Sequence, residues 1–216
     1  YDPFFHSRRK TTNINGIGSN SVPRVFSDLS RCDNIRPEDL APLGYLYSKE
    51  QDKWHLSEQA VDYLYVGDNK IEFELPGTLS IIQNSKIWKE NDQSYPVYNL
   101  DNYRTTSKRS NQMNFLFIDD KTITDELKLI LNEDKTIVLI LRNSDEHSVM
   151  LHRKFIIDMF DLGITAPVIL NRSYNDISNL DFQIKSSIDI GSLYIDGLGD
   201  GVWVDFGSEY GIVNQT

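Results

Sequence analysis

The stretch NFLFIDDKTITDELKLILNEDKTIVLIL, residues 114–141, predicts a strand, a helix and a second strand in immediate succession. Its two ends are short, continuously apolar runs, which are typical of strands covered on both faces. Between them, apolar residues recur at the spacing of one helix face, namely Ile123, Leu127, Ile130 and Leu131. Thr122 or Thr124 precedes them as a helix cap. The stretch therefore favours a β-α-β unit within a parallel sheet.

The same alternation continues toward the end of the chain. A second helix is predicted over residues 144–162, with acidic side chains in its first turn and Gly163 after its last. A third is predicted over 180–195, until Gly197 and Gly199 break it. These glycines lead from a helix into a strand, so no helix N-terminus faces a bound anion there. We interpret them as a helix stop followed by a tight turn.

Eight apolar runs rich in β-branched and aromatic residues qualify as strands. They cover residues 22–29, 63–66, 79–82, 96–100, 114–118, 137–141, 167–170 and 202–206. The region 31–62 gives only one short helix signal, at 37–43, and its path is not predicted. Eight strand–helix units predict an α/β fold, a (β/α)8 TIM-barrel-like domain with some helices shortened. An open doubly wound sheet is the alternative, because periodicity alone does not show closure.

The sequence predicts one domain with short extensions. Residues 1–21 are polar, include the basic run Arg8-Arg9-Lys10, and are interpreted as an N-terminal arm or linker. Residues 22–213 form the single barrel-like domain. Residues 214–216 are expected to begin a linker to an iron–sulfur domain that this sequence does not contain.

The composition disfavours several classes of function. A net charge of −10 over 216 residues disfavours nucleic acid and anionic membranes as partners, because both attract basic surfaces. Neither a membrane-spanning apolar run nor a signal-peptide pattern is present, so we expect a cytoplasmic protein. Cys32 is the single cysteine and the four histidines lack metal-binding spacing, so we expect no metal site.

Barrel enzymes gather their functional side chains at the carboxyl ends of the strands. In this sequence the polar residues at those ends are Asp28, Asp68, Asp119, Arg142, Asn143, Arg172 and Asp205. Four carboxylates against two arginines predict an acidic mouth, which suits an anionic substrate poorly. We interpret the set as salt-bridged rim residues, with a ligand site as the alternative.

Residues 185–206, KSSIDIGSLYIDGLGDGVWVDF, resemble a signature of the 4-hydroxy-3-methylbut-2-enyl diphosphate synthase family. Residues 22–30, VPRVFSDLS, also resemble this family. Its long members carry a second barrel-like domain between the catalytic barrel and the iron–sulfur domain. Residues 191–201 are more similar to the version of the motif in that inserted domain than to the catalytic version. The chain is thus identified as resembling the inserted middle domain of the three-domain form.

The resemblance implies a parent enzyme of the methylerythritol phosphate pathway of isoprenoid biosynthesis. That enzyme reductively converts 2-C-methyl-D-erythritol 2,4-cyclodiphosphate to 4-hydroxy-3-methylbut-2-enyl diphosphate, using an iron–sulfur cluster and electrons from ferredoxin or flavodoxin. In the family's catalytic barrel, an Arg and a Ser of the last strand contact the diphosphate. Trp203 and Asp205 stand at those positions here. The resemblance therefore implies no catalytic or cofactor-binding residue in this chain.

The role implied for this chain is that of a noncatalytic spacer. Its partners would be the catalytic barrel and the iron–sulfur domain of the same polypeptide. The alternative is a docking or regulatory module for the electron donor or for a small effector. An acidic donor protein would be repelled by the negative net charge of this domain.

Overall fold

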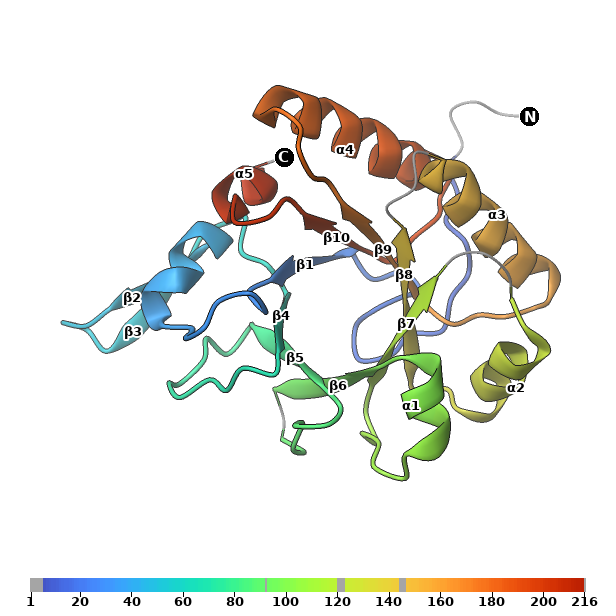
Figure 1. Cartoon of the computed structure of the whole chain (residues 1–216), viewed down its shortest axis with the longest axis horizontal. Helices are drawn as coiled ribbons and strands as arrows, with labels where there is room; N and C mark the ends of the chain where they lie inside the picture. Colours follow the sequence, from blue (N-terminus) through green and yellow to red (C-terminus); the bar gives the residue numbers. More distant parts are fainter. Residues whose placement is uncertain (1–5, 92, 120–122, 144–146, 216) are drawn as a thin grey trace.

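The computed structural model describes residues 6–91, 93–119, 123–143 and 147–215, and over these residues eight parallel strands close into a barrel (Figure 1). The ring order is β1-β10-β9-β8-β7-β6-β5-β4. Strand β1 closes it by pairing with β10 on one side and β4 on the other. Of the two predicted architectures, the (β/α)8 barrel is thus confirmed and the open sheet is wrong, since the ring leaves none of its strand edges unpaired.

The elements have the following bounds. The barrel strands are β1 (Arg24–Asp28), β4 (Tyr63–Gly67), β5 (Ser80–Asn84), β6 (Ser94–Tyr98), β7 (Asn114–Asp119), β8 (Ile137–Asn143), β9 (Val168–Ser173) and β10 (Gly201–Asp205). An antiparallel hairpin lies outside the ring and consists of β2 (Tyr45–Ser48) and β3 (Lys53–Leu56). The helices are the 3-10 helix η1 (Pro37–Leu43), α1 (Leu100–Thr105), α2 (Asp125–Glu133), α3 (Ser148–Asp161), α4 (Asn179–Ile195) and α5 (Tyr210–Gln215).

Local capping residues determine where the predicted helices begin and end. The Thr124 side chain accepts from the backbone N–H of Leu127 and starts α2, whereas Thr122 lies outside the described residues. The description of α3 starts at Ser148, and the predicted first turn at 144–146 lies outside the described residues. Gly197 and Gly199 have φ of 74° and 94°, as expected for a helix stop and a tight turn.

Two segments differ from the sequence expectation. The strand expected at 96–100 is β6, which ends at Tyr98 because the Asn99 side chain accepts from the Asn102 N–H and starts α1. The unassigned aromatic stretch after η1 forms the β2–β3 hairpin. Its Trp54 ring packs against Tyr45 and Tyr47 of the same hairpin and against Phe73 of the loop after β4. The Tyr45 hydroxyl donates to the Val61 carbonyl at 2.6 Å, which ties the hairpin to the segment before β4.

The helices cover the barrel unevenly. On the β7–β9 side, outward residues such as Leu116, Leu139 and Leu170 are fully buried beneath α1 to α4. On the β4–β5 side, η1 and the loop after β4 provide the cover, burying Leu64 and Ile81. The two faces enclose separate outer cores, and a third cluster fills the barrel interior. None of the described helices is both long and apolar enough to cross a bilayer.

Residues 6–21, which the sequence predicts as an arm or linker, fold back over the amino-terminal end of the barrel. Ile17 is fully buried and Ile14 nearly so, in the same cluster as the interior barrel side chains. The backbone N–H of Arg9 donates to the Gly197 carbonyl at 2.9 Å. Figure 1 shows this arm crossing behind the strands. Ile14 and Ile17 are isolated within a polar segment, so the sequence pattern did not predict their burial. That burial attaches the arm to the domain.

The buried carboxylate of Asp200 anchors the arm. It accepts hydrogen bonds from the Val168 N–H and the Thr11 hydroxyl, both at 2.9 Å. The guanidinium groups of Arg8 and Arg9 lie 3.4 and 3.7 Å from it. Burial lowers the pKa of Arg9, and the nearby Asp200 charge opposes that shift. Arg8 and Arg9 of the basic run therefore both contact one carboxylate in the turn before β10, and Arg9 also donates to the Ile164 and Ala166 carbonyls.

Replacing Asp200 by alanine should lower the free energy of unfolding by about 3–5 kcal/mol, because two arginines and a strand N–H lose their buried acceptor. Urea unfolding followed by circular dichroism measures the change. The control is Asp196→Ala, which removes a half-exposed pair with Arg153 and should cost less than about 1 kcal/mol. Equal losses in the two variants would show that Asp200 is not an anchor.

Candidate functional site

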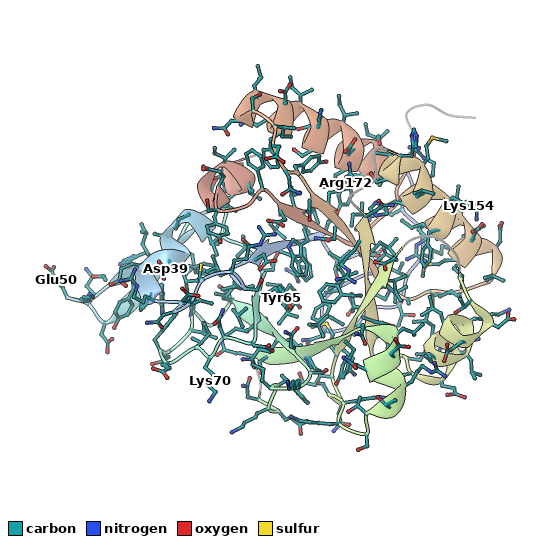
Figure 2. All side chains as sticks on the ribbon, viewed as in Figure 1. Asp39, Glu50, Tyr65, Lys70, Lys154 and Arg172 are labelled. Carbon is teal, nitrogen blue, oxygen red and sulfur yellow. The ribbon has the colours of Figure 1, made fainter. Side chains whose placement is uncertain are left out.

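The interior of the barrel is filled by aromatic rings. They come from five strands and are Phe26, Tyr63, Tyr65, Tyr95, Phe115, Phe117 and Trp203. Phe26 stacks on Tyr63 with ring centroids 4.8 Å apart, and Trp203 lies 5.3 Å from Tyr65. Figure 2 places Tyr65 near the middle of the ring. Aromatic side chains therefore fill the interior from the arm, where the Asn15 amide donates to the Tyr95 hydroxyl, to the mouth, where Tyr65, Phe117 and Trp203 lie.

Strand alternation divides the predicted rim residues into two groups. Asp205 has the parity of Trp203, and Arg142 has that of the interior residue Ile140, so both alternate toward the inside. Asn143 and Arg172 have the opposite parity. The single mouth cluster expected from the sequence is therefore not formed, because strand ends one residue apart face opposite sides.

Two aspartates lie on the inner side of the rim. Asp205 accepts from both terminal nitrogens of Arg31, at 2.7 and 3.2 Å. Asp28 accepts from the Ser30 N–H at 2.7 Å. Burial raises the pKa of Asp28, the Ser30 hydrogen bonds oppose this, and the Asp205 charge adds to it. This part of the mouth is negatively charged, and the guanidinium of Arg31 is paired with Asp205.

A cleft of about 350 Å³ adjoins the other side of the mouth, between the ends of β4 to β8. Tyr65 donates to the Asn84 amide oxygen at 2.8 Å, and the Asn84 amide donates to Asp68 at 2.9 Å. Arg142 stacks over the Phe117 ring at 4.3 Å and lies 3.6 Å from Asp119. The cleft therefore combines amide, carboxylate and guanidinium groups, each of which has a protein partner.

Arg172 belongs to the attachment of the outer helices, not to the mouth. It donates to Asp189 of α4 at 2.9 Å and to the Asn143 carbonyl at 3.1 Å. The Tyr174 hydroxyl donates to the same Asp189 carboxylate at 2.8 Å. In Figure 2, Arg172 lies on the side of the ring toward α4. The signal for this pair was the carboxylate of Asp189, which stands between Ile188 and Ile190 on α4.

The described residues contain no group of three or more His, Cys, Asp or Glu side chains arranged to hold a metal ion. An iron–sulfur cluster is held by several thiolates, and Cys32 alone does not fit one. The Cys32 thiol instead lies 3.8 Å from the Tyr210 hydroxyl, between η1 and α5. The residues present therefore do not fit a cluster within this chain.

Curated relatives carry the name that the sequence motif suggested. One region of 4-hydroxy-3-methylbut-2-en-1-yl diphosphate synthase (flavodoxin) from Parabacteroides distasonis is 26% identical to this chain over 202 residues. The chain is similar to one part of this synthase. The match covers 94% of the chain and 30% of the Parabacteroides protein. The homologous protein of Bacteroides thetaiotaomicron is 27% identical over 199 residues, which are 92% of this chain and 29% of that synthase.

The chain thus spans about 30% of the length of the synthases that it matches. No family model matches the chain. No solved structure matches it either. The homology extends over nearly the whole chain, including the middle region for which the sequence motifs gave only an architectural likeness.

His152 of α3 is buried and is affected by the charges of Arg172 and Asp189. Its protonation provides a test of the packing in this region. Burial, with a contribution from the Arg172 charge, lowers the pKa of His152 from 6.5 to about 4. Between those values the unfolded chain binds a proton that the folded chain excludes. The free energy of unfolding should therefore fall as the pH drops from 6.5 toward 4.

Urea unfolding at several pH values measures this dependence, and His152→Leu should reduce its slope in that window. The matched control is His55→Leu, because His55 is exposed on β3 and should leave the slope unchanged. Identical slopes in wild type and His152→Leu would contradict the buried neutral imidazole.

Proposed function

We propose that this chain is a noncatalytic domain of a 4-hydroxy-3-methylbut-2-en-1-yl diphosphate synthase, inserted between its catalytic barrel and its iron–sulfur domain. The parent enzyme then reduces 2-C-methyl-D-erythritol 2,4-cyclodiphosphate in the cytoplasm with electrons from flavodoxin, the donor in the names of the relatives. The domain contributes shape and spacing to that reaction and no reacting group.

The observation that carries the proposal is the state of the last strand. Trp203 is buried among the interior rings, where it stacks near Phe26 and Tyr65. Asp205 places a negative charge at the mouth and is held by Arg31. A diphosphate needs cations and hydrogen-bond donors at this position, and it would be repelled by a carboxylate. The geometry therefore supports a barrel without a diphosphate site.

The rigidity of the barrel also supports the spacer role. The strands form a closed ring, the interior is packed with rings, and the arm closes its amino-terminal end. Such a body holds two flanking domains at a fixed separation better than a flexible linker of similar length would. The catalytic barrel and the iron–sulfur domain of the same polypeptide are the proposed partners.

Deletion from a full-length relative tests the spacer role. In the Bacteroides thetaiotaomicron synthase, the region that matches this chain is removed and its flanks are rejoined. Turnover should fall by about 100-fold or more, because a misplaced cluster domain no longer reaches the substrate, while cluster absorbance is retained. Full turnover in the deletion variant would refute the spacer role.

A point variant separates spacing from catalysis. Changing Asp205 to Asn in the inserted domain should leave turnover within about twofold of the wild type, because a spacer uses no charge at its mouth. If the domain contributed to catalysis through its mouth, the same change would lower turnover strongly. The thermal midpoint of the variant serves as the control for folding.

The polar cleft beside Arg142 favours a regulatory role as the second candidate. Its 350 Å³ can hold a small effector, and its groups of both signs suit a zwitterion better than a diphosphate. Titration of the isolated domain with reduced flavodoxin or with a set of amino acids, followed by chemical shifts of the Asn84 and Asn99 amides, tests this role. Absence of any shift would remove it.

A further inference from the structure

An apolar groove of about 540 Å³ runs along the outside of the barrel over β1 and β10. Its floor consists of Val25, Val202 and Val204. One wall is the side of α4 that carries Phe182, Ser186, Ile190 and Tyr194. The opposite wall is the segment 58–60, which leads from the hairpin into β4.

The outer cover of the described barrel is incomplete at this groove. Leu139 and Leu141, which face outward on β8, are fully buried, whereas Val25 on β1 is 38% exposed. The difference has a simple cause in the topology. Each strand from β6 to β9 is followed by a helix that returns along the barrel wall, and α4 leaves room for another beside it. A (β/α)8 barrel places its eighth helix in this position.

The short helix α5 begins at the entrance to the groove. It follows the last strand, as an eighth helix should, and lies beside η1 near β10 and β1 (Figure 1). Val213 and Asn214, near its end, line the groove. Residues 210–215 make only the first turns of a helix, and they leave the floor valines uncovered.

We propose that α5 is the start of the eighth outer helix, and that the polypeptide continues beyond residue 216 as an amphipathic helix seated in this groove. The occupant is thus the direct continuation of α5 and not a separate protein. The α4 wall extends from Phe182 to Tyr194, and twelve residues at a rise of 1.5 Å correspond to about 18 Å. The continuing helix should therefore have about 12 residues.

The groove also defines the chemistry of that helix. Its floor and the α4 wall require one stripe of apolar side chains at i, i+3, i+4 and i+7. Ser186 and Gly191 on the α4 wall have small side chains, which allow close approach of a second helix backbone. The outer face of the helix would meet solvent and is expected to be polar.

The test follows the reading frame beyond residue 216 and compares the protein with and without the next 16 encoded residues. These residues should show the apolar stripe, and a stop codon or a proline within the first ten would overturn the proposal. In the longer protein, amide exchange of residues 211–214 should slow by more than about tenfold, because a frayed terminal helix becomes an internal one. Unchanged exchange would also overturn it.

A matched pair of variants locates the helix. Val25→Asp, in the groove floor, should abolish most of the added protection in the longer protein. Val22→Asp should leave it intact, because Val22 is 76% exposed and does not line the groove. If the two variants behave alike, the continuation does not lie in the groove.

The proposal rests on the barrel topology and stands apart from the proposed function. A reading frame that encodes the helix and then stops would support the eighth helix while removing the iron–sulfur domain. A reading frame that encodes a cysteine-rich domain without a preceding helix would do the reverse.

Discussion

The pairing of β1 with β10 is the constraint on which the rest of the structure depends. Arg24 to Phe26 align with Gly201 to Trp203, so the first and last strands of the ring are neighbours. With this contact the sheet has no free edge, and its interior becomes a closed space whose volume must be filled. The large rings of Phe26 and Trp203 fill it from the two sides of that seam.

The filled interior supports the proposed role of this barrel as a domain without a substrate site. Functional barrels keep polar groups at the carboxyl ends of several strands and room above them. Here the rings of Tyr65, Phe117 and Trp203 reach that level, and the nearby charges are matched within the chain: Asp205 by Arg31 and Asp119 by Arg142. Packing and charge pairing thus contribute to stability at the end of the barrel where barrel enzymes gather their functional side chains.

The sequence predicted the β-α-β order because short, continuously apolar runs alternate between residues 114 and 206 with segments whose apolar residues have helical spacing. It predicted the rim positions as well, but not their directions. Arg172 was expected among the rim residues of the mouth, but the alternation of β9 turns it outward toward Asp189 and α4. The packing of the arm onto the barrel was not predicted, for a different reason. Its burial depends on Ile14, Ile17 and the distant Asp200, and no local pattern reports a contact across about 180 residues.

The anchoring of the arm by Asp200 has a consequence for synthesis on the ribosome. Within this domain the arm and β1 are made before their partners, Asp200 and β10, which emerge about 180 residues later. At about 5–20 residues per second this delay is roughly 9–36 s. During that interval β1 has a free edge toward β10, and the apolar arm residues have no pocket. Residues 6–30 must therefore stay soluble, without their final partners, until β10 has been synthesised.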